Sequence, residues 1–248
     1  MLMTEIIAIV QARMGSTRLP GKVIMNLIGK PMLFHELSRI ARAKRISSIV
    51  IATSTLPLDD CIVNFCKESD WHYFRGSESD VLDRYYQCAM QFDADIIVRL
   101  TADCPLIEPK IIDKVVGEFI DKSPNVDYVS NIIPQRTFPQ GLDTEVLSFS
   151  ALERSWTEDK NPALREHVTQ YILRNPDKFR LAGVMNDRDV SSLRWTVDTK
   201  EDFQLVNEIY SFFGHNRFSW YDVLDLIEKK PELRLINQNI RQKEVLSP

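Results

Sequence analysis

Long apolar runs are missing from this sequence. No stretch approaches the roughly 20 apolar residues that a membrane-spanning helix requires. The N-terminal apolar run of about six residues is too short for the core of a signal peptide. The four cysteines form no CxxC pair and show no Cys/His spacing typical of a metal site. We therefore expect buried free thiols in a cytoplasmic protein that has no membrane partner.

An excess of basic charge is also missing. The chain has 31 Lys and Arg against 35 Asp and Glu, a net charge of −4. Nucleic-acid-binding proteins usually present a strongly basic surface, so this balance argues against a nucleic-acid partner. With 44% hydrophobic and 27% charged residues, the composition is that of an ordinary globular protein that can bury a substantial core.

Apolar segments of strand length alternate with amphipathic segments of helix length in the first half of the chain. This order is typical of an α/β fold with a doubly wound, mostly parallel sheet. The periodicity predicts strands over residues 6–10, 49–53, 71–74 and 95–100, and helices over residues 31–43, 58–67, 81–92 and 111–120.

The second half is less regular. We predict strands over residues 127–130, 145–149, 179–184 and 193–197, and helices over residues 163–174, 202–213 and 220–229. Because no internal repeat or linker divides the chain, we expect one domain over residues 1–248, with an insertion-like part at about residues 130–190. The tail after Leu235 is expected to pack loosely. Trp156, Trp195 and Trp220 are interpreted as core residues.

A loop rich in cations and small residues follows the first predicted strand, in the stretch QARMGSTRLPGKV. Ligands of open α/β sheets bind beyond the carboxyl ends of the strands, where cations can neutralise phosphate and glycine lets the backbone approach. Five residues separate Gly15 from Gly21, whereas the Walker pattern needs four, and GxGxxG is absent. The residues alone leave open a phosphate loop of another kind and a solvated basic turn.

Two aspartates, distant in sequence, follow predicted strands. Asp103 lies in VRLTADCPLI and Asp198 lies in RWTVDTKEDF. Carboxylates at strand ends can converge on one Mg²⁺, which takes oxygen ligands and keeps phosphate and water in its other positions. Each aspartate also has a purely structural interpretation: Asp103 could cap the turn before Pro105, and Asp198 could cap the helix that starts near Thr199.

Three further segments carry polar residues of interest. In RGSESDVLDRYYQ, Ser79 or Asp80 could cap the helix that begins at residue 81. Asp143 and Glu145, after the turn at Gly141, could bind sugar hydroxyls or face solvent on an edge strand. In ALREHVTQYI, Arg165 could pair with a sugar carboxylate, and His167 could be a general base or a capping or core histidine.

The loop motif resembles the N-terminal signature of cytidylyltransferases that activate acidic sugars, including the 3-deoxy-manno-octulosonate cytidylyltransferases and the CMP-sialic acid synthetases. It is most similar to the spore coat polysaccharide biosynthesis protein F family. The similarity continues through LIGKPML, VIATS, VRLTADCPLI, GLDTEV and RWTVDTKEDF, and covers most of residues 5–206. The family pattern falls on Ala12, Arg13, Ser16, Arg18, Pro20 and Lys22.

The resemblance implies a Rossmann-like fold of the nucleotide-diphospho-sugar transferase type. It also implies transfer of CMP from CTP to an acidic 2-keto sugar, with release of pyrophosphate, for polysaccharide or glycan biosynthesis. A homodimer is implied as well, with residues 130–190 expected at the contact. The chain has Ala102 and Cys104 where the octulosonate enzymes carry Gly and Glu.

The resemblance also distributes roles among the residues. Asp103 and Asp198 are the implied Mg²⁺ ligands, and the implied catalytic residues are Arg13, Lys22, Asp103 and Asp198. The candidate nucleotide-binding residues are Ala12, Arg13, Gly15, Ser16, Arg18, Lys22, Arg75, Ser79 and Asp80. The candidate sugar-binding residues are Gly141, Asp143, Glu145, Arg165 and His167.

Two other functions stay open from the sequence. Because such a loop binds phosphates rather than bases, the chain could be a nucleotidyltransferase that acts on a sugar 1-phosphate or another phosphorylated acceptor. A non-catalytic nucleotide-binding subunit of a polysaccharide assembly system is the alternative of another class.

Overall fold

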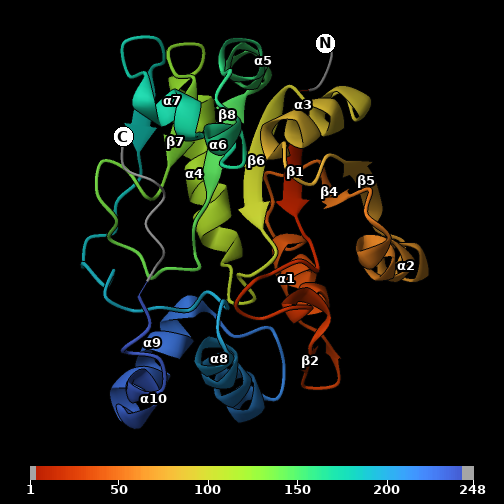
Figure 1. The fold of residues 1–248 in the computed structure, drawn as a ribbon. Coiled ribbons are helices and arrows are strands. Elements are labelled where there is room, and N and C mark those ends of the chain that lie inside the picture. The colour runs from red at the N-terminus through yellow and green to blue at the C-terminus, as the bar shows by residue number, and fades with distance from the viewer. Residues whose placement is uncertain (1–3, 242–248) are drawn as a thin grey trace.

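The centre of the molecule is a seven-stranded sheet with the strand order β5-β4-β1-β6-β8-β7-β9 (Figure 1). The computed structural model describes residues 4–241. Within this sheet only β8 runs antiparallel to its neighbours, so the predicted mostly parallel sheet is confirmed. The strands are β1 (Ile6–Gln11), β4 (Ser48–Ser54), β5 (His72–Gly76), β6 (Ile96–Thr101), β7 (Tyr128–Ser130), β8 (Glu145–Ser148) and β9 (Leu181–Gly183).

Helices cover both faces of the sheet because successive side chains of each strand point to opposite faces. Ala8 and Val10 of β1 join a core that includes α1 (Met32–Ile40), α2 (Asp60–Glu68) and α4 (Pro109–Lys122). Ile7 and Ile9 join a second core with α3 (Val81–Gln91), α5 (Phe149–Glu158) and α7 (Gln170–Arg174). The alternation within one strand thus accounts for both layers.

The strand order reverses at β1. The chain runs from β1 to β4 and β5 on one side, and then returns to β6 on the other side. The carboxyl ends of β1 and β6 therefore diverge into the loops that flank a crevice, the position where open α/β sheets bind ligands. The hydroxyl of Tyr85, on α3, lies 3.1 Å from the carbonyl oxygens of both Ile9 and Leu100 and ties the two strands together.

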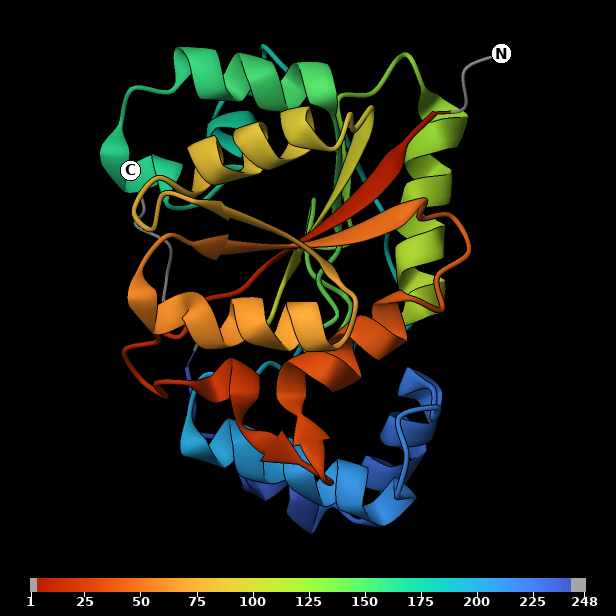
Figure 2. The ribbon, with the colours of Figure 1, turned by 90° about the vertical axis from the view of Figure 1, so that its right-hand side faces the viewer.

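A layer of C-terminal helices lies beyond the carboxyl edge of the sheet (Figure 2). It consists of α8 (Lys200–Phe213), α9 (Trp220–Lys229) and α10 (Glu232–Leu235). Arg39 of α1 is wholly buried and fastens this layer, since it donates to the carbonyl oxygens of Ile107 at 2.6 Å, Asn216 at 2.9 Å and Phe218 at 3.0 Å. None of the helices described within residues 4–241 is long and apolar enough to cross a membrane.

Most predicted elements are present, and two predictions are wrong. The helix predicted over residues 163–174 is split into α6 (Pro162–Arg165) and α7, with two tight turns between them. The β-branched pair Val168 and Thr169 disfavours a continuous helix there. The segment 193–197 is extended but forms only one isolated bridge, between Gln140 and Arg194, because the chain then bends toward Asp103.

The predictions about particular side chains have mixed outcomes. Trp195 and Trp220 are buried as predicted, whereas Trp156 is only partly buried and stacks on Tyr86 with ring centroids 4.1 Å apart. All four cysteines are free. The loosely packed tail is wrong for Asn237, which is buried and hydrogen-bonded to Arg194 and Asp202. Gln238, Asn239 and Arg241 are exposed, and residues 242–248 of that tail lie outside the described residues.

Replacing Tyr85 with Phe removes the hydroxyl that ties β1 to β6. We expect the free energy of unfolding, measured by urea denaturation, to fall by about 1 kcal/mol, the usual contribution of an intramolecular hydrogen bond. Tyr221→Phe, on the exposed side of α9, is the matched control and should leave stability unchanged. Equal effects of the two substitutions would contradict this role.

Candidate active site

A cavity of about 370 Å³ opens at the carboxyl ends of β1 and β6. We call it the first chamber. The loop after β1 forms one wall and the end of β6 forms the other, and both are close because β1 and β6 are neighbours in the sheet. The lining residues are Gln11, Ala12, Arg13, Ser16, Thr17, Arg18, Lys22, Val23, Thr101, Ala102, Asp103, Glu166, His167 and Asp198.

Lys22 lines this chamber, although its side chain is only 9% exposed and charged groups are seldom so buried. Its Nζ donates to an oxygen of Asp103 at 2.9 Å, to an oxygen of Asp198 at 2.9 Å and to the carbonyl oxygen of Val197 at 2.7 Å. One ammonium group therefore bridges the two aspartates, which the sequence analysis placed at one site.

The charges of this cluster stabilise one another. Burial alone would lower the pKa of Lys22, but the carboxylates of Asp103 and Asp198 outweigh it, so the pKa lies above its usual value. Burial would likewise raise the pKa of Asp103, but Lys22 and a hydrogen bond from Thr101 Oγ1 at 2.7 Å hold that pKa below its usual value. Both groups are therefore charged at neutral pH.

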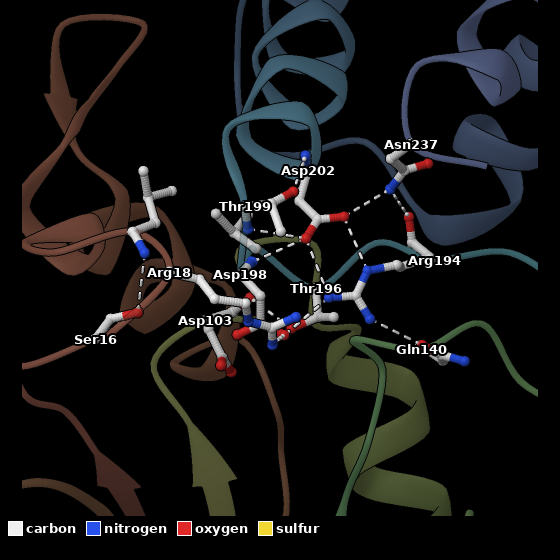
Figure 3. A network of polar contacts seen from close by, with 12 residues as sticks. Ser16, Arg18, Asp103, Gln140, Arg194, Thr196, Asp198, Thr199, Asp202 and Asn237 are labelled. Carbon is white, nitrogen blue, oxygen red and sulfur yellow. Dashed lines mark hydrogen bonds and ion pairs between the residues drawn. The ribbon is translucent and has the colours of Figure 1, made fainter. Parts of the chain in front are cut away.

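Asp198 also contacts two arginines. Its Oδ2 lies 2.8 Å from Arg18 of the loop and 2.8 Å from Arg194 (Figure 3). The capping interpretation of Asp198 is wrong, because Thr199 is the residue that caps α8. Asp103 accepts hydrogen bonds from side chains, including Lys22 and Thr101, rather than capping the turn before Pro105.

The two carboxylates fit a divalent cation. A cation placed between them is within reach of both, as the contacts of Lys22 demonstrate. Across residues 4–241, no group of three or more His, Cys, Asp or Glu side chains could hold a metal ion. An ion at Asp103 and Asp198 would therefore complete its coordination with phosphate and water, which is the usual habit of Mg²⁺.

A second cavity, of about 600 Å³, meets the first and is called the second chamber. The two share six residues that come from the loop, from the end of β6, from the turns between α6 and α7, and from the segment before α8. These shared residues are Arg18, Thr101, Asp103, Glu166, His167 and Asp198. Asp103 and Asp198 thus lie where the two chambers meet.

Ion pairs form much of the wall of the second chamber. Asp143 pairs with both terminal nitrogens of Arg136, and Glu145 accepts from Arg99 at 2.6 Å. Because β8 lies between β6 and β7, the prediction of an exposed edge strand is wrong, and Glu145 is buried. These pairs present polar groups that can hydrogen-bond hydroxyls without leaving a buried charge unpaired.

Gly141 allows the backbone to close the second chamber against the segment before Asp198. Its φ is +101°, in the region that favours glycine. A Cβ at this position would lie 2.5 Å from the backbone nitrogen of Thr196 and 2.7 Å from the carbonyl carbon of Trp195. The close approach of these two segments therefore requires glycine.

His167 and Glu166 project from the turns between α6 and α7 toward both chambers. His167 is half-buried, and this burial lowers the pKa of its imidazole below the usual value, so the ring is neutral at pH 7. Glu166 accepts from Arg13 at 3.3 Å across the mouth of the first chamber. The break in the predicted helix is thus what brings this pair to the site.

Besides Gly15, four candidate residues line neither chamber. Arg75 is held by Asp60 and by the carbonyl oxygens of Ser54 and Leu56. Asp80, rather than the exposed Ser79, caps α3, because its side chain accepts from the backbone of residue 83.

Arg165, the fourth of these candidates, is bound to Asp80. Its Nε donates to Asp80 at 2.8 Å, and it also donates to the carbonyl oxygens of Trp156 and Asp159. This arginine fastens α6 to the start of α3. Arg165 does not line the second chamber.

The smaller loop residues lie where the motif suggests. Ala12 and Ser16 line the first chamber, and Ser16 Oγ also accepts from the backbone nitrogen of Leu19. Gly15 lies in the same loop, where an added Cβ would be 3.4 Å from Glu78. Sequence reasoning missed Thr101, Arg136, Gln140 and Thr196, and it missed Arg194, since neither spacing nor residue type sets them apart from other polar residues of the chain.

The sequence matches known proteins along almost its whole length. A family model described as cytidylyltransferase matches residues 7–243. The chain belongs to the cytidylyltransferase family. It is a nucleotidyltransferase enzyme, which confirms the resemblance and contradicts the non-catalytic alternative.

Relatives of this cytidylyltransferase support the assignment. An uncharacterised protein of Methanocaldococcus jannaschii is 39% identical over 243 residues, which are 96% of this chain and 97% of that protein. Spore coat polysaccharide biosynthesis protein SpsF of Bacillus subtilis is 31% identical over 238 residues, 93% and 97% of the two chains. A 3-deoxy-manno-octulosonate cytidylyltransferase of Geobacter metallireducens is 35% identical over 116 residues, 47% of this chain and 45% of that enzyme.

A solved structure shares the fold. The cytidylyltransferase from Leptospira borgpetersenii is 35% identical, with a TM-score of 0.90 over 98% of this chain and 100% of that chain. The α/β architecture with its mostly parallel sheet is thus the architecture of a known cytidylyltransferase.

Replacing Gly141 with Ala should destabilise the protein and distort the second chamber. We expect the free energy of unfolding to fall by about 2 kcal/mol or more, because backbone strain adds to a steric clash. Gly29→Ala is the matched control, since Gly29 has a φ of +86° but nothing within 4 Å of an added Cβ. That variant should lose only about 1 kcal/mol. Equal losses in urea denaturation would rule out the proposed clash.

Proposed function

We propose that this cytidylyltransferase transfers CMP from CTP to an acidic 2-keto sugar, with release of pyrophosphate, in the biosynthesis of a surface polysaccharide or another glycan. The observation that carries the proposal is the meeting of two chambers at Asp103 and Asp198. Such an arrangement supports binding of nucleotide on one side and acceptor on the other, with the reacting atoms between them.

The first chamber suits the triphosphate. Arg13, Arg18 and Lys22 supply three cations from one loop, and Ser16 supplies a hydroxyl. Arg18 and Arg13 are 27% and 39% exposed, so both can turn from their carboxylate partners to phosphate oxygens. Preorganised positive charge of this kind stabilises the charge that develops on the phosphates as the bond to pyrophosphate breaks.

We assign a divalent cation, Mg²⁺, to Asp103 and Asp198. When bound, this ion would offset negative charge on the phosphate oxygens. The two carboxylates hold the cation and orient the triphosphate, and Lys22 is then available to contact phosphate. Arg13, Lys22, Asp103 and Asp198 are thus proposed as the catalytic residues.

His167 is the proposed general base. Its position at both chambers and its neutral imidazole suit removal of a proton from the acceptor hydroxyl. The hydroxyl oxygen then bonds to the α-phosphorus, the bond from that phosphorus to pyrophosphate breaks, and a nitrogen of His167 keeps the proton. No covalent enzyme intermediate is required.

The acidic acceptor is supported by the chemistry of the second chamber. Arg18 and Arg136 are about one quarter exposed there and can face a carboxylate. Gln140, Asp143 and Glu145 supply groups that can hydrogen-bond sugar hydroxyls. We assign the carboxylate to these arginines rather than to Arg165. Homodimerisation through residues 130–190 stays a prediction of the resemblance.

The acceptor assignment can be tested by pyrophosphate release. With CTP and Mg²⁺, we expect turnover on a 2-keto sugar acid of eight or nine carbons, and little on the corresponding sugar reduced at the carboxylate. Turnover on a sugar 1-phosphate, with none on a 2-keto acid, would overturn the assignment.

Asp198→Asn should lower kcat by at least about 100-fold, because it removes charge at the cation site. The variant should unfold within a few degrees of the wild-type melting temperature.

The role of His167 predicts an acid limb in the pH dependence of kcat/KM. Because burial lowers the pKa of His167, activity should hold through pH 7 and fall only below its ordinary value of 6.5, as the imidazole becomes protonated. His167→Gln should lower kcat by about 100-fold and abolish this limb. Persistence of the same limb in the variant would exclude His167 as the base.

A further inference from the structure

Asp202 is buried more thoroughly than helix capping requires. It is 0% exposed and is the third residue of α8. One oxygen, Oδ2, accepts from the backbone nitrogens of Thr199 and Asp198, both at 3.0 Å, which completes the capping box. The other oxygen, Oδ1, takes no part in capping and accepts from Arg194 Nε and Asn237 Nδ2, both at 2.9 Å. The Asp202 carboxylate therefore has partners beyond those that capping requires.

Arg194 links this buried carboxylate to the cation site. Its terminal nitrogen NH2 donates to Asp202 at 3.0 Å and to Asp198 Oδ2 at 2.8 Å, and NH1 donates to Gln140 at 3.1 Å (Figure 3). The planar guanidinium fixes the direction of all these contacts together. Arg194 thereby orients the carboxylate of Asp198, and Asp202 accepts a hydrogen bond from the backbone nitrogen of Asp198.

The three cations around Asp198 differ in their freedom. Arg18 and Lys22 line the first chamber and can turn to phosphate, whereas Arg194 lines neither chamber. Its side chain is 6% exposed, against 9% for Lys22 and 27% for Arg18, so Arg194 differs from Lys22 in facing neither chamber rather than in its exposure. Arg194 therefore does not reach a substrate in either chamber, but it can keep its contact with Asp198 when Arg18 and Lys22 turn to phosphate.

The C-terminal segment fastens this arrangement. Asn237 follows α10, is 5% exposed, and donates through Nδ2 to both Asp202 Oδ1 and the carbonyl oxygen of Arg194, each at 2.9 Å. One amide group therefore joins the segment after the last described helix to the two residues that hold Asp198.

We propose that Arg194, supported by Asp202 and Asn237, is a positioning residue that orients Asp198 for the divalent cation. This inference rests on the proposed function, in which Asp198 is a cation ligand. Groups that orient metal ligands from behind influence metal affinity by about 10- to 100-fold. The structure thus assigns the last part of the chain a part in cation binding, without any contact to substrate.

Binding of Mn²⁺ in the presence of CTP, without acceptor, tests the proposal directly. Free Mn²⁺ is measured by electron paramagnetic resonance. We expect Arg194→Lys to raise the Mn²⁺ dissociation constant by about tenfold, since a lysine cannot reproduce the fork between Asp198 and Asp202. Asn237→Ala, which is farther from the site, should raise it by about two- to fivefold. The KM for CTP at saturating metal should change much less than the metal requirement.

Thr199→Ala is the matched control. It removes the hydroxyl that accepts from the backbone of Asp202, and so weakens the start of α8, but it leaves the contacts of Arg194 intact. A merely structural role predicts lower melting temperatures in all three variants and unchanged Mn²⁺ affinity of the folded protein. That result would overturn the proposal. If Arg194→Lys fails to fold, the Mn²⁺ affinities of Asn237→Ala and Thr199→Ala are compared instead. Equal affinities in these two variants would overturn the proposal.

Asp198→Asn separates this inference from the proposed function. Loss of Mn²⁺ binding in Asp198→Asn, together with wild-type affinity in Arg194→Lys and Asn237→Ala, overturns only the positioning role. Wild-type Mn²⁺ affinity in Asp198→Asn overturns the assignment of the cation ligand itself, and the positioning role with it. Weaker Mn²⁺ binding in Asp198→Asn, Arg194→Lys and Asn237→Ala, with unchanged Mn²⁺ binding in Thr199→Ala, supports both the cation ligand and the positioning role.

Discussion

Repulsion between two carboxylates is the constraint on which the site depends. Asp103 and Asp198 come from distant parts of the chain and converge on one point, which is unfavourable unless a cation lies between them. The ammonium of Lys22 meets this need and places the loop after β1 at the same point. The opening loop, the end of β6 and the segment before α8 are thus joined by one charge, and the two chambers form around it.

Local periodicity was enough to predict the layers of the fold. The strands β1, β4 and β6 are apolar because helices cover both their faces, and such runs stand out in any sequence. Where tertiary contacts determine the backbone conformation, the secondary structure predicted from sequence was wrong. The extended segment 193–197 has strand-like residues, but its partners are Gln140 and Asp103 rather than a second strand. Helix α5 went unpredicted, although Ser148 caps it.

Sequence alone predicted only those residues of the candidate site that lie within short motifs. Arg13, Ser16, Arg18 and Lys22 stand within one loop, so their common purpose is visible in the order of residues. Arg165 has the same chemistry but is bound to Asp80, a partner that no spacing reveals. Arg136, Gln140 and Arg194 were missed because the fold, and not their residue type or spacing, brings them to the site.

The position of Asp198 after β9, the last strand described in the sheet, has a consequence for how the site is assembled. A nascent chain that has not yet extended beyond the sheet already carries Arg13, Lys22 and Asp103, but it lacks the second carboxylate and the Val197 carbonyl that holds Lys22. The carboxylates of Asp103 and Asp198 thus come together only where the C-terminal helices, held by Arg39 and by the Asp202 network, lie beside the end of β6.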